Sequence, residues 1–154
     1  MDNLKLTIEL VPSTSWFNNL RNQMSRKDWD TLRMTTYSKY NHCCGICNDH
    51  PKMLHCHELW DYNDKLHIQT LKGFIALCVM CHHVKHIGYA GILADKGELN
   101  FDDVVKHFMK INNCGRDTFY QYHDEIFNLW NERSKYNWKI DLGIYADLVQ
   151  QPKA

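Results

Sequence analysis

Four cysteines in the middle of the chain have the spacing of a metal site. They form two C-x-x-C pairs, Cys44 with Cys47 and Cys78 with Cys81, separated by 30 residues. Each pair can offer two thiolates at about tetrahedral separation, and four thiolates close the coordination shell of a structural zinc. Cys43 precedes Cys44, so the first pair has two candidate registers, but only Cys44 gives the two-residue gap. The spacing predicts a structural Zn²⁺ on Cys44, Cys47, Cys78 and Cys81.

Histidines beside these pairs predict a second metal site. His82 and His86 follow the second pair at a spacing of i and i+4, which places both on one face of a helix. His57 lies between the pairs, in a short strand expected over residues 53–60, where it points away from Glu58. Three protein ligands with open positions are typical of a catalytic metal site. We therefore expect a divalent ion such as Mg²⁺, Mn²⁺ or Ni²⁺ on His57, His82 and His86.

Composition indicates one folded domain over residues 1–154. The hydrophobic fraction of 44% is that of a globular chain, and 18 basic residues balance 18 acidic ones. A net charge of zero gives no support to DNA binding, which would then need a local basic patch. The N-terminus lacks the pattern of a signal peptide, and no apolar run reaches the length of a membrane span. We expect a cytoplasmic protein, in which paired C-x-x-C sequences indicate metal binding before disulfides.

The flanking segments must supply the core that a small metal module lacks. Residues 4–11 alternate apolar and polar side chains and predict a short N-terminal strand that ends at Pro12. Trp16 and Phe17 are expected to be buried. Three glycines over residues 88–97 predict a turn-rich link. Capping residues and helical spacing of apolar side chains predict three helices, over residues 25–40, 100–112 and 117–134.

At the cysteine and histidine positions the sequence resembles the zinc-knuckle branch of the HNH endonuclease family. The matching stretches are the two C-x-x-C pairs, the apolar run Phe74–Leu77 before Cys78, and the C-H after the second pair, with Lys85-His86 following. The flanks also look like an uncharacterised bacterial and phage group of HNH endonucleases. The resemblance implies an α+β fold, in which residues 43–87 form a zinc-stapled ββα-metal module. Residues 1–42 and 88–154 would form a helical jacket around it.

Two positions depart from the family pattern. Glu58 stands where the family has its general-base histidine, and Gly73 where it has a central asparagine. A glutamate can accept a proton from water, but its reference pKa of about 4.3 makes it a weak base near neutrality unless its surroundings raise that pKa. A shift of one residue in the alignment would make His57 the base instead and leave Glu58 in support. Lys85, in the helix of the expected metal site, is a candidate phosphate contact.

Three functions follow as hypotheses. The first is a metal-dependent HNH-type endonuclease that hydrolyses DNA phosphodiester bonds, with Glu58 or His57 activating water. The second is a catalytically lapsed HNH scaffold that binds DNA or a protein partner, for example as a phage-encoded inhibitor, and the changes at Glu58 and Gly73 favour it. The third is a zinc-stabilised structural protein whose aromatic helices oligomerise.

Overall fold

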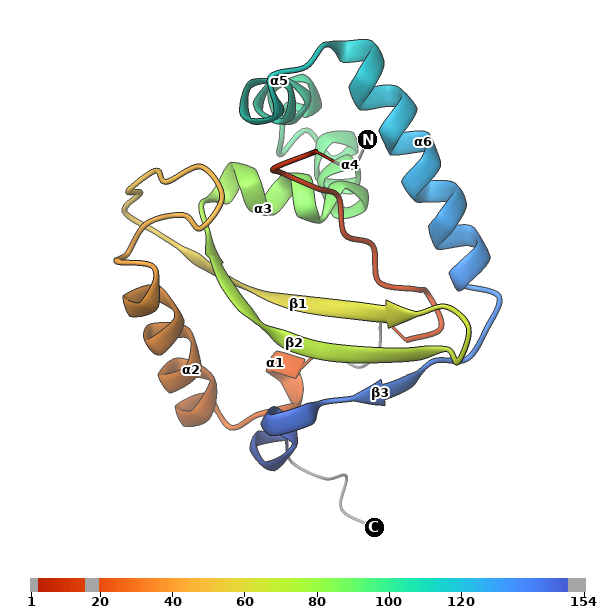
Figure 1. Cartoon of the computed structure of the whole chain (residues 1–154). Coiled ribbons are helices and arrows are strands. Elements are labelled where there is room, and N and C mark those ends of the chain that lie inside the picture. Colours follow the sequence, from red (N-terminus) through yellow and green to blue (C-terminus); the bar gives the residue numbers. More distant parts are fainter. Residues whose placement is uncertain (1–2, 16–19, 150–154) are drawn as a thin grey trace.

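A β-hairpin crosses the middle of the molecule (Figure 1). The computed structural model describes residues 3–15 and 20–149. Strand β1 (His55–Asn63) pairs antiparallel with β2 (Ile68–Leu77), and the short strand β3 (Lys139–Asp141) pairs parallel with β2. Asn63 closes the hairpin turn, because its side chain accepts hydrogen bonds from the backbone N–H groups of Lys65 and Leu66. The order β1-β2-β3 leaves β1 at one edge of the sheet.

Helices cover both faces of this sheet (Figure 1). One side carries α3 (Val79–Lys85), α4 (Ile87–Asp95), α5 (Phe101–Asn112) and α6 (Arg116–Arg133). The other side carries α1 (Leu20–Gln23), α2 (Arg26–Lys39) and a 3₁₀ helix (Gly143–Leu148). The protein is therefore a mixed α+β fold in which a three-stranded sheet lies between two groups of helices.

The sheet separates two hydrophobic cores of unequal size. The larger core packs α3, α5 and α6 against the β2 residues Ile75 and Leu77, with Phe108 and Phe119 fully buried at its centre. The smaller core packs Phe74 and neighbouring residues against α1, α2 and the 3₁₀ helix. Truncation of a buried phenylalanine to alanine typically costs about 3–5 kcal/mol. The larger core is thus the main support for α3, which carries several of the predicted metal ligands.

The three predicted helices are confirmed, with small changes at their ends. Ser25 caps α2 by accepting a hydrogen bond from the backbone N–H of Asp28 at 3.1 Å. Asn100 caps α5 in the same way through the N–H of Asp102 at 3.0 Å. These are the capping interactions that a polar side chain supplies to the otherwise unpaired N–H groups of the first helical turn.

The predicted N-terminal strand is wrong. Residues 4–11 bend at Lys5 and Leu6 and pair with no described strand, although Leu6 and Ile8 are buried as the alternation required. Its backbone groups bond to helices instead. The Asn112 side chain holds the N–H and C=O of Leu6, each at 2.9 Å, and the Tyr122 hydroxyl accepts from the N–H of Ile8 at 3.0 Å. Side chains of the helices thus supply the hydrogen bonds that a neighbouring strand would have supplied in the predicted sheet.

The predicted turn-rich link over residues 88–97 is also wrong over most of its length, because α4 occupies it. Ile87 and Ala90, one turn apart on α4, form its buried face. Their packing offsets the loss of helix stability that its two glycines cause. Trp16 and Phe17 lie outside the described residues. In the part of the chain that the structure describes, no helix has both the length and the apolar character needed to cross a membrane.

Candidate metal centres

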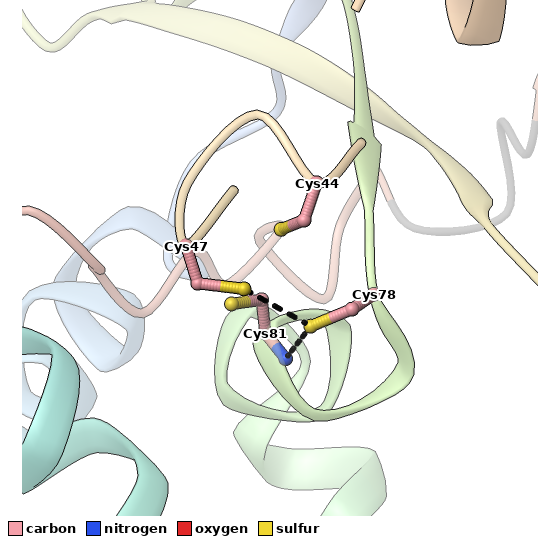
Figure 2. Close-up of side chains that lie close together, drawn as sticks. All are labelled: Cys44, Cys47, Cys78 and Cys81. Carbon is pink, nitrogen blue, oxygen red and sulfur yellow. Dashed lines mark hydrogen bonds between the residues drawn. The ribbon is translucent and has the colours of Figure 1, made fainter. Parts of the chain in front are cut away.

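The four cysteines of the two C-x-x-C pairs come together at one end of the hairpin (Figure 2). Their sulfur atoms all lie within 4.8 Å of one another, and this group, Cys44, Cys47, Cys78 and Cys81, is called the cysteine cluster below. The Sγ atoms of Cys47 and Cys78 are 3.7 Å apart. A tetrahedral zinc with Zn–S bonds near 2.3 Å places its sulfurs about 3.8 Å apart. The geometry is thus consistent with a structural metal such as zinc.

The backbone around the cysteine cluster is prearranged for metal binding. The backbone N–H of Cys81 donates to the Sγ of Cys78 at 3.4 Å, at the start of α3, and the N–H of Gly45 donates to the carbonyl of Ala76 at 2.7 Å. A Cβ on Gly45 would lie 2.7 Å from the Ile75 side chain, so only glycine allows this turn to approach β2 so closely. The first pair is therefore held tightly against the strand that leads into the second.

Electrostatics favour a cation in the cysteine cluster. Contacts from Cys78 and Cys81 lower the pKa of Cys44, and the same contact with Cys44 raises the pKa of Cys78 to about 11. One negative charge is thus easily held among these thiols, whereas four thiolates need a compensating cation. All seven cysteines are free, and Cys43, the alternative ligand, is directed to Asn41 and His50 outside the cluster. Of the two candidates, Cys44 and not Cys43 lies with the other three cysteines.

His107 was not anticipated as a neighbour of this cluster. It lies on α5, and its Nε2 is 3.2 Å from the Sγ of Cys81. Burial lowers the pKa of His107, which favours the neutral ring. A signal for it was present in the sequence, because a histidine between Val104 and Phe108 interrupts the apolar face of an amphipathic helix.

The three predicted histidines also come together. The ligand nitrogens of His57, His82 and His86, called the histidine cluster below, lie within 4.8 Å of one another. The edge strand β1 supplies the first, α3 the second, and the junction between α3 and α4 the third. Ring centroids are 4.6 Å apart for His82 and His86, and 4.9 Å for His57 and His86. Strand β1 and helix α3 thus bring together the three histidines that were predicted to form one site.

The donor set of the histidine cluster fits a transition metal better than Mg²⁺. Burial, and then the neighbouring imidazoles, lower the pKa of His82 to about 2 and that of His86 to about 4. Neutral imidazole is the form that ligates metals. Imidazole nitrogens suit zinc, nickel, copper and iron, whereas magnesium prefers oxygen ligands. Of the ions expected from the sequence, Ni²⁺ therefore fits these residues best and Mg²⁺ least.

Two further residues contact the histidine cluster. The Nδ1 atoms of His55 and His82 are 2.8 Å apart, so one ring donates to the other. Glu9, from the N-terminal segment, accepts a hydrogen bond from His57 Nε2 at 2.6 Å. The alternation of β1 was enough to place His55 on the face of His57, but no local pattern identified Glu9, whose partner is 48 positions away.

Glu9 also contacts Lys85, and this corrects the role predicted for that lysine. Lys85 is only 4% exposed, and its ammonium donates to Glu9 Oε1 and to the Thr7 hydroxyl, both at 2.8 Å. Burial raises the pKa of Glu9, but the hydrogen bond from His57 and the charge of Lys85 outweigh it and lower that pKa to about 2. Buried and paired, Lys85 is not available as a phosphate contact.

Glu58 lies next to His57 on β1 but points to the opposite face. His57 pairs with Ile75, which belongs to the larger core, and Glu58 pairs with Phe74, which belongs to the smaller one. Trp60 Nε1 donates to Glu58 Oε2 at 3.0 Å. Burial raises the pKa of Glu58, which strengthens the carboxylate as a base. Glu58 is outside the histidine cluster, and Gly73, the other departure, lies in β2 opposite Leu59, where the register of the hairpin shifts.

A cavity of about 600 Å³ lies at the free edge of β1 and connects these groups. The histidine cluster and Glu58 both line it, together with the N-terminal segment and α6. The aromatic residues in its wall are Trp29, Trp60, Tyr62, Tyr89 and Trp130. The chain matches no protein-family model, no curated protein and no solved structure, so the geometry of these two clusters and this cavity is the basis for assigning a function.

Proposed function

We propose that this protein is a metal-dependent endonuclease of the HNH type, which hydrolyses DNA phosphodiester bonds. The observation that carries the proposal is the convergence of three imidazoles from β1, α3 and the junction of α3 with α4, beside a cysteine cluster that holds the same hairpin and helix. A hairpin followed directly by a histidine-bearing helix is the order of parts that the resemblance to the HNH family implies. A structural zinc would occupy the cysteine cluster, and a catalytic divalent ion the histidine cluster.

Each group has a separate role in this proposal. A divalent ion at the histidine cluster would stabilise the charge that develops on the phosphate and on the leaving oxygen. Glu58 would accept the proton of the attacking water. His57 is the weaker candidate for this base, because it belongs to the histidine cluster and its Nε2 is already bonded to Glu9. Glu58 faces the same cavity and accepts a hydrogen bond from Trp60 Nε1 at 3.0 Å.

The aromatic wall of the cavity favours a nucleic-acid substrate. Trp60 and Tyr62 follow Glu58 on the same face of β1, and both line the cavity. Stacking of a base on an aromatic side chain is worth about 1–3 kcal/mol and tolerates any base, because every base has a π-face. Such stacking would contribute to DNA binding independently of the net charge, which is zero for this chain. In the expected cytoplasmic setting the thiols of the cysteine cluster would remain reduced.

Plasmid cleavage tests the proposal directly. The purified zinc-loaded chain is incubated with supercoiled plasmid and Ni²⁺, Zn²⁺, Mn²⁺ or Mg²⁺, and nicked and linear products are quantified. The donor set predicts the highest rate with Ni²⁺ or Zn²⁺ and the lowest with Mg²⁺. His86→Ala should abolish cleavage, whereas His83→Ala, a change on the same helix outside the histidine cluster, should not. Absence of cleavage with every metal would refute the nuclease.

A catalytically lapsed module that binds DNA or a protein partner is the second candidate. Two observations favour it: Glu58 points to the face of β1 opposite His57, and Lys85 is buried against Glu9. Metal counting separates the candidates. Two tightly bound ions per chain, by elemental analysis, agree with the enzyme, while a single zinc agrees with the binding module.

A further inference from the structure

Glu9 reaches the histidine cluster from the other end of the chain. We propose that Glu9 is a positioning residue, which fixes the orientation and the proton of His57 so that this histidine can bind the metal ion. The inference rests on the proposed metal site and adds to it a residue outside the hairpin and helix. It makes the N-terminal segment a necessary part of the site.

Both oxygens of the Glu9 carboxylate are occupied by donors. Oε2 accepts from His57 Nε2 at 2.6 Å, and Oε1 accepts from the Lys85 ammonium at 2.8 Å. His57 and Lys85 are each only 4% exposed, so water does not compete strongly for either donor. A carboxamide could not replace this carboxylate, because it has one acceptor oxygen and its NH₂ group would face one of the two donors.

The contact at Nε2 determines which nitrogen of His57 remains free. A neutral imidazole carries its proton on one nitrogen and a lone pair on the other. In a neutral His57 ring whose Nε2–H donates to Glu9, the lone pair lies on Nδ1, where it could bind a metal ion. Metal-binding histidines commonly donate their other N–H to a carboxylate, which orients the ring and increases its basicity, and loss of that partner typically costs about 10–100-fold in metal affinity.

The surrounding bonds hold Glu9 against α3. The backbone N–H of Glu9 donates to the carbonyl of Lys85 at 3.0 Å, and the Lys85 ammonium also reaches Thr7. Lys85 lies immediately before His86, so one segment supplies a member of the histidine cluster and the residue that anchors Glu9. Backbone and side-chain hydrogen bonds thereby fix the position of the N-terminal segment relative to the histidine cluster.

Metal affinity measured on the full chain tests this role. With zinc retained in the cysteine cluster, Co²⁺ is titrated into the histidine cluster, and its dissociation constant is measured by absorbance. Glu9→Gln should weaken Co²⁺ binding by about 10–100-fold. Glu98→Gln is the matched control, since it removes the same charge from an exposed residue, and it should leave the constant unchanged.

A double variant separates positioning from a loss of stability. Glu9→Gln leaves the Lys85 ammonium without a full partner, so this variant is expected to be less stable. Glu9→Leu combined with Lys85→Met removes both charges and should restore the melting temperature, because apolar residues often replace a buried ion pair without loss. If Glu9 only stabilised the fold, this variant would regain metal affinity. A positioning role predicts that its Co²⁺ affinity stays about 10–100-fold weaker.

The protonation of His57 gives a readout that stability does not affect. Correlations between imidazole ¹⁵N and ring protons should show the proton on Nε2 in the unaltered apo protein and a mixture of tautomers in the double variant. Unchanged metal affinity and an unchanged tautomer in the double variant would overturn the role of Glu9 and leave the nuclease intact. Failure of the unaltered chain to bind Co²⁺ beyond its zinc would overturn both.

Discussion

The cysteine cluster and the histidine cluster lie on the same hairpin and helix, yet they are built in opposite ways. The first is closed: four sulfurs face one another, Cys44 and Cys81 have no exposed surface, and the members come from the loop before β1 and the N-terminus of α3. The second is open: three imidazoles border a cavity of about 600 Å³ and come from an edge strand and a helix. Closed thiolate sites stabilise folds, whereas three-ligand sites leave room for a substrate. Under the proposed function, the first cluster would stabilise the fold and the second would form the active site.

The residues that contact each cluster from outside also differ: one belongs to the larger core and the other to a peripheral segment. The cysteine cluster has His107, a neutral ring on α5 within the larger core. The histidine cluster has Glu9, a charged group on an N-terminal segment that lies outside the described helices and strands. A ligand supported by the core cannot move without unfolding. A ligand supported by a peripheral segment can be changed while the fold survives, and the predictions below use this difference.

The largest effect is expected for Cys81→Ser, which opens the cysteine cluster. Binding of a structural zinc contributes about 10–16 kcal/mol in zinc-finger peptides, which is as much as the whole stability of a typical domain. The variant should lose its zinc and its cooperative thermal unfolding, as followed by circular dichroism. Cys114→Ser is the control, because Cys114 is a partly buried cysteine outside the cluster, and its effect should be about 1 kcal/mol. A Cys81→Ser protein that melts like the unaltered chain would contradict a structural role.

The next effect is expected for His86→Ala, and it should fall on function and not on folding. Elemental analysis should show two metal ions per chain in the unaltered protein and one, the zinc, in the variant. DNA cleavage should be lost with every metal, while the melting temperature measured without added metal changes little. If His86→Ala released the zinc as well, the two clusters would be one coupled unit and the comparison above would fail.

The difference between the clusters also explains how much the sequence could predict. The C-x-x-C spacing is local, so it identified all four members of the cysteine cluster, and helical spacing identified His82 and His86 in the same way. The α+β class and three of the helices followed from caps and apolar periodicity. All these features depend on residues that are close together in the chain.

The failures all involve contacts between distant residues. Alternation in residues 4–11 correctly buried Leu6 and Ile8 but predicted a strand, because the actual partners of this backbone are side chains more than 100 positions away. The helix α4 was missed because Ile87 and Ala90 are stabilised by tertiary packing, which outweighs the glycines. Lys85 was predicted to be a phosphate contact because nothing local indicates a carboxylate partner 76 positions earlier.

A smaller effect is expected for His107→Ala, which removes the outer neighbour of the cysteine cluster. Loss of such a contact typically weakens metal binding by about 10–100-fold, so zinc should pass to a competing chelator at lower chelator concentrations. Co²⁺ affinity at the histidine cluster should not change. His123→Ala on α6 serves as the control, because His123 contacts Asp124 and the rings of Phe119 and Phe127, which do not belong to the cysteine cluster. A fall in affinity at both clusters would indicate damage to the larger core.

The smallest effect is expected for Asn112→Ala, which loosens the N-terminal segment without touching either cluster. The change leaves α5 intact, since alanine favours helix, but it removes both hydrogen bonds to the buried backbone of Leu6. Each unsatisfied buried group costs about 1–3 kcal/mol. Amide hydrogen exchange should therefore accelerate at Ile8 and Glu9, and the Co²⁺ affinity of the histidine cluster should fall by less than in Glu9→Gln, because Lys85 still holds Glu9.

The same exchange experiment contains its own internal comparison. The N–H of Gly45, bonded to Ala76 beside the cysteine cluster, should exchange at an unchanged rate in Asn112→Ala, as should all amides in Asn131→Ala, an exposed change on α6. Acceleration at Gly45 equal to that at Glu9 would mean that the N-terminal segment supports the whole fold. Acceleration confined to Ile8 and Glu9 would mean that this segment belongs to the histidine cluster alone, so that the open site can lose its support while the closed site keeps the protein folded.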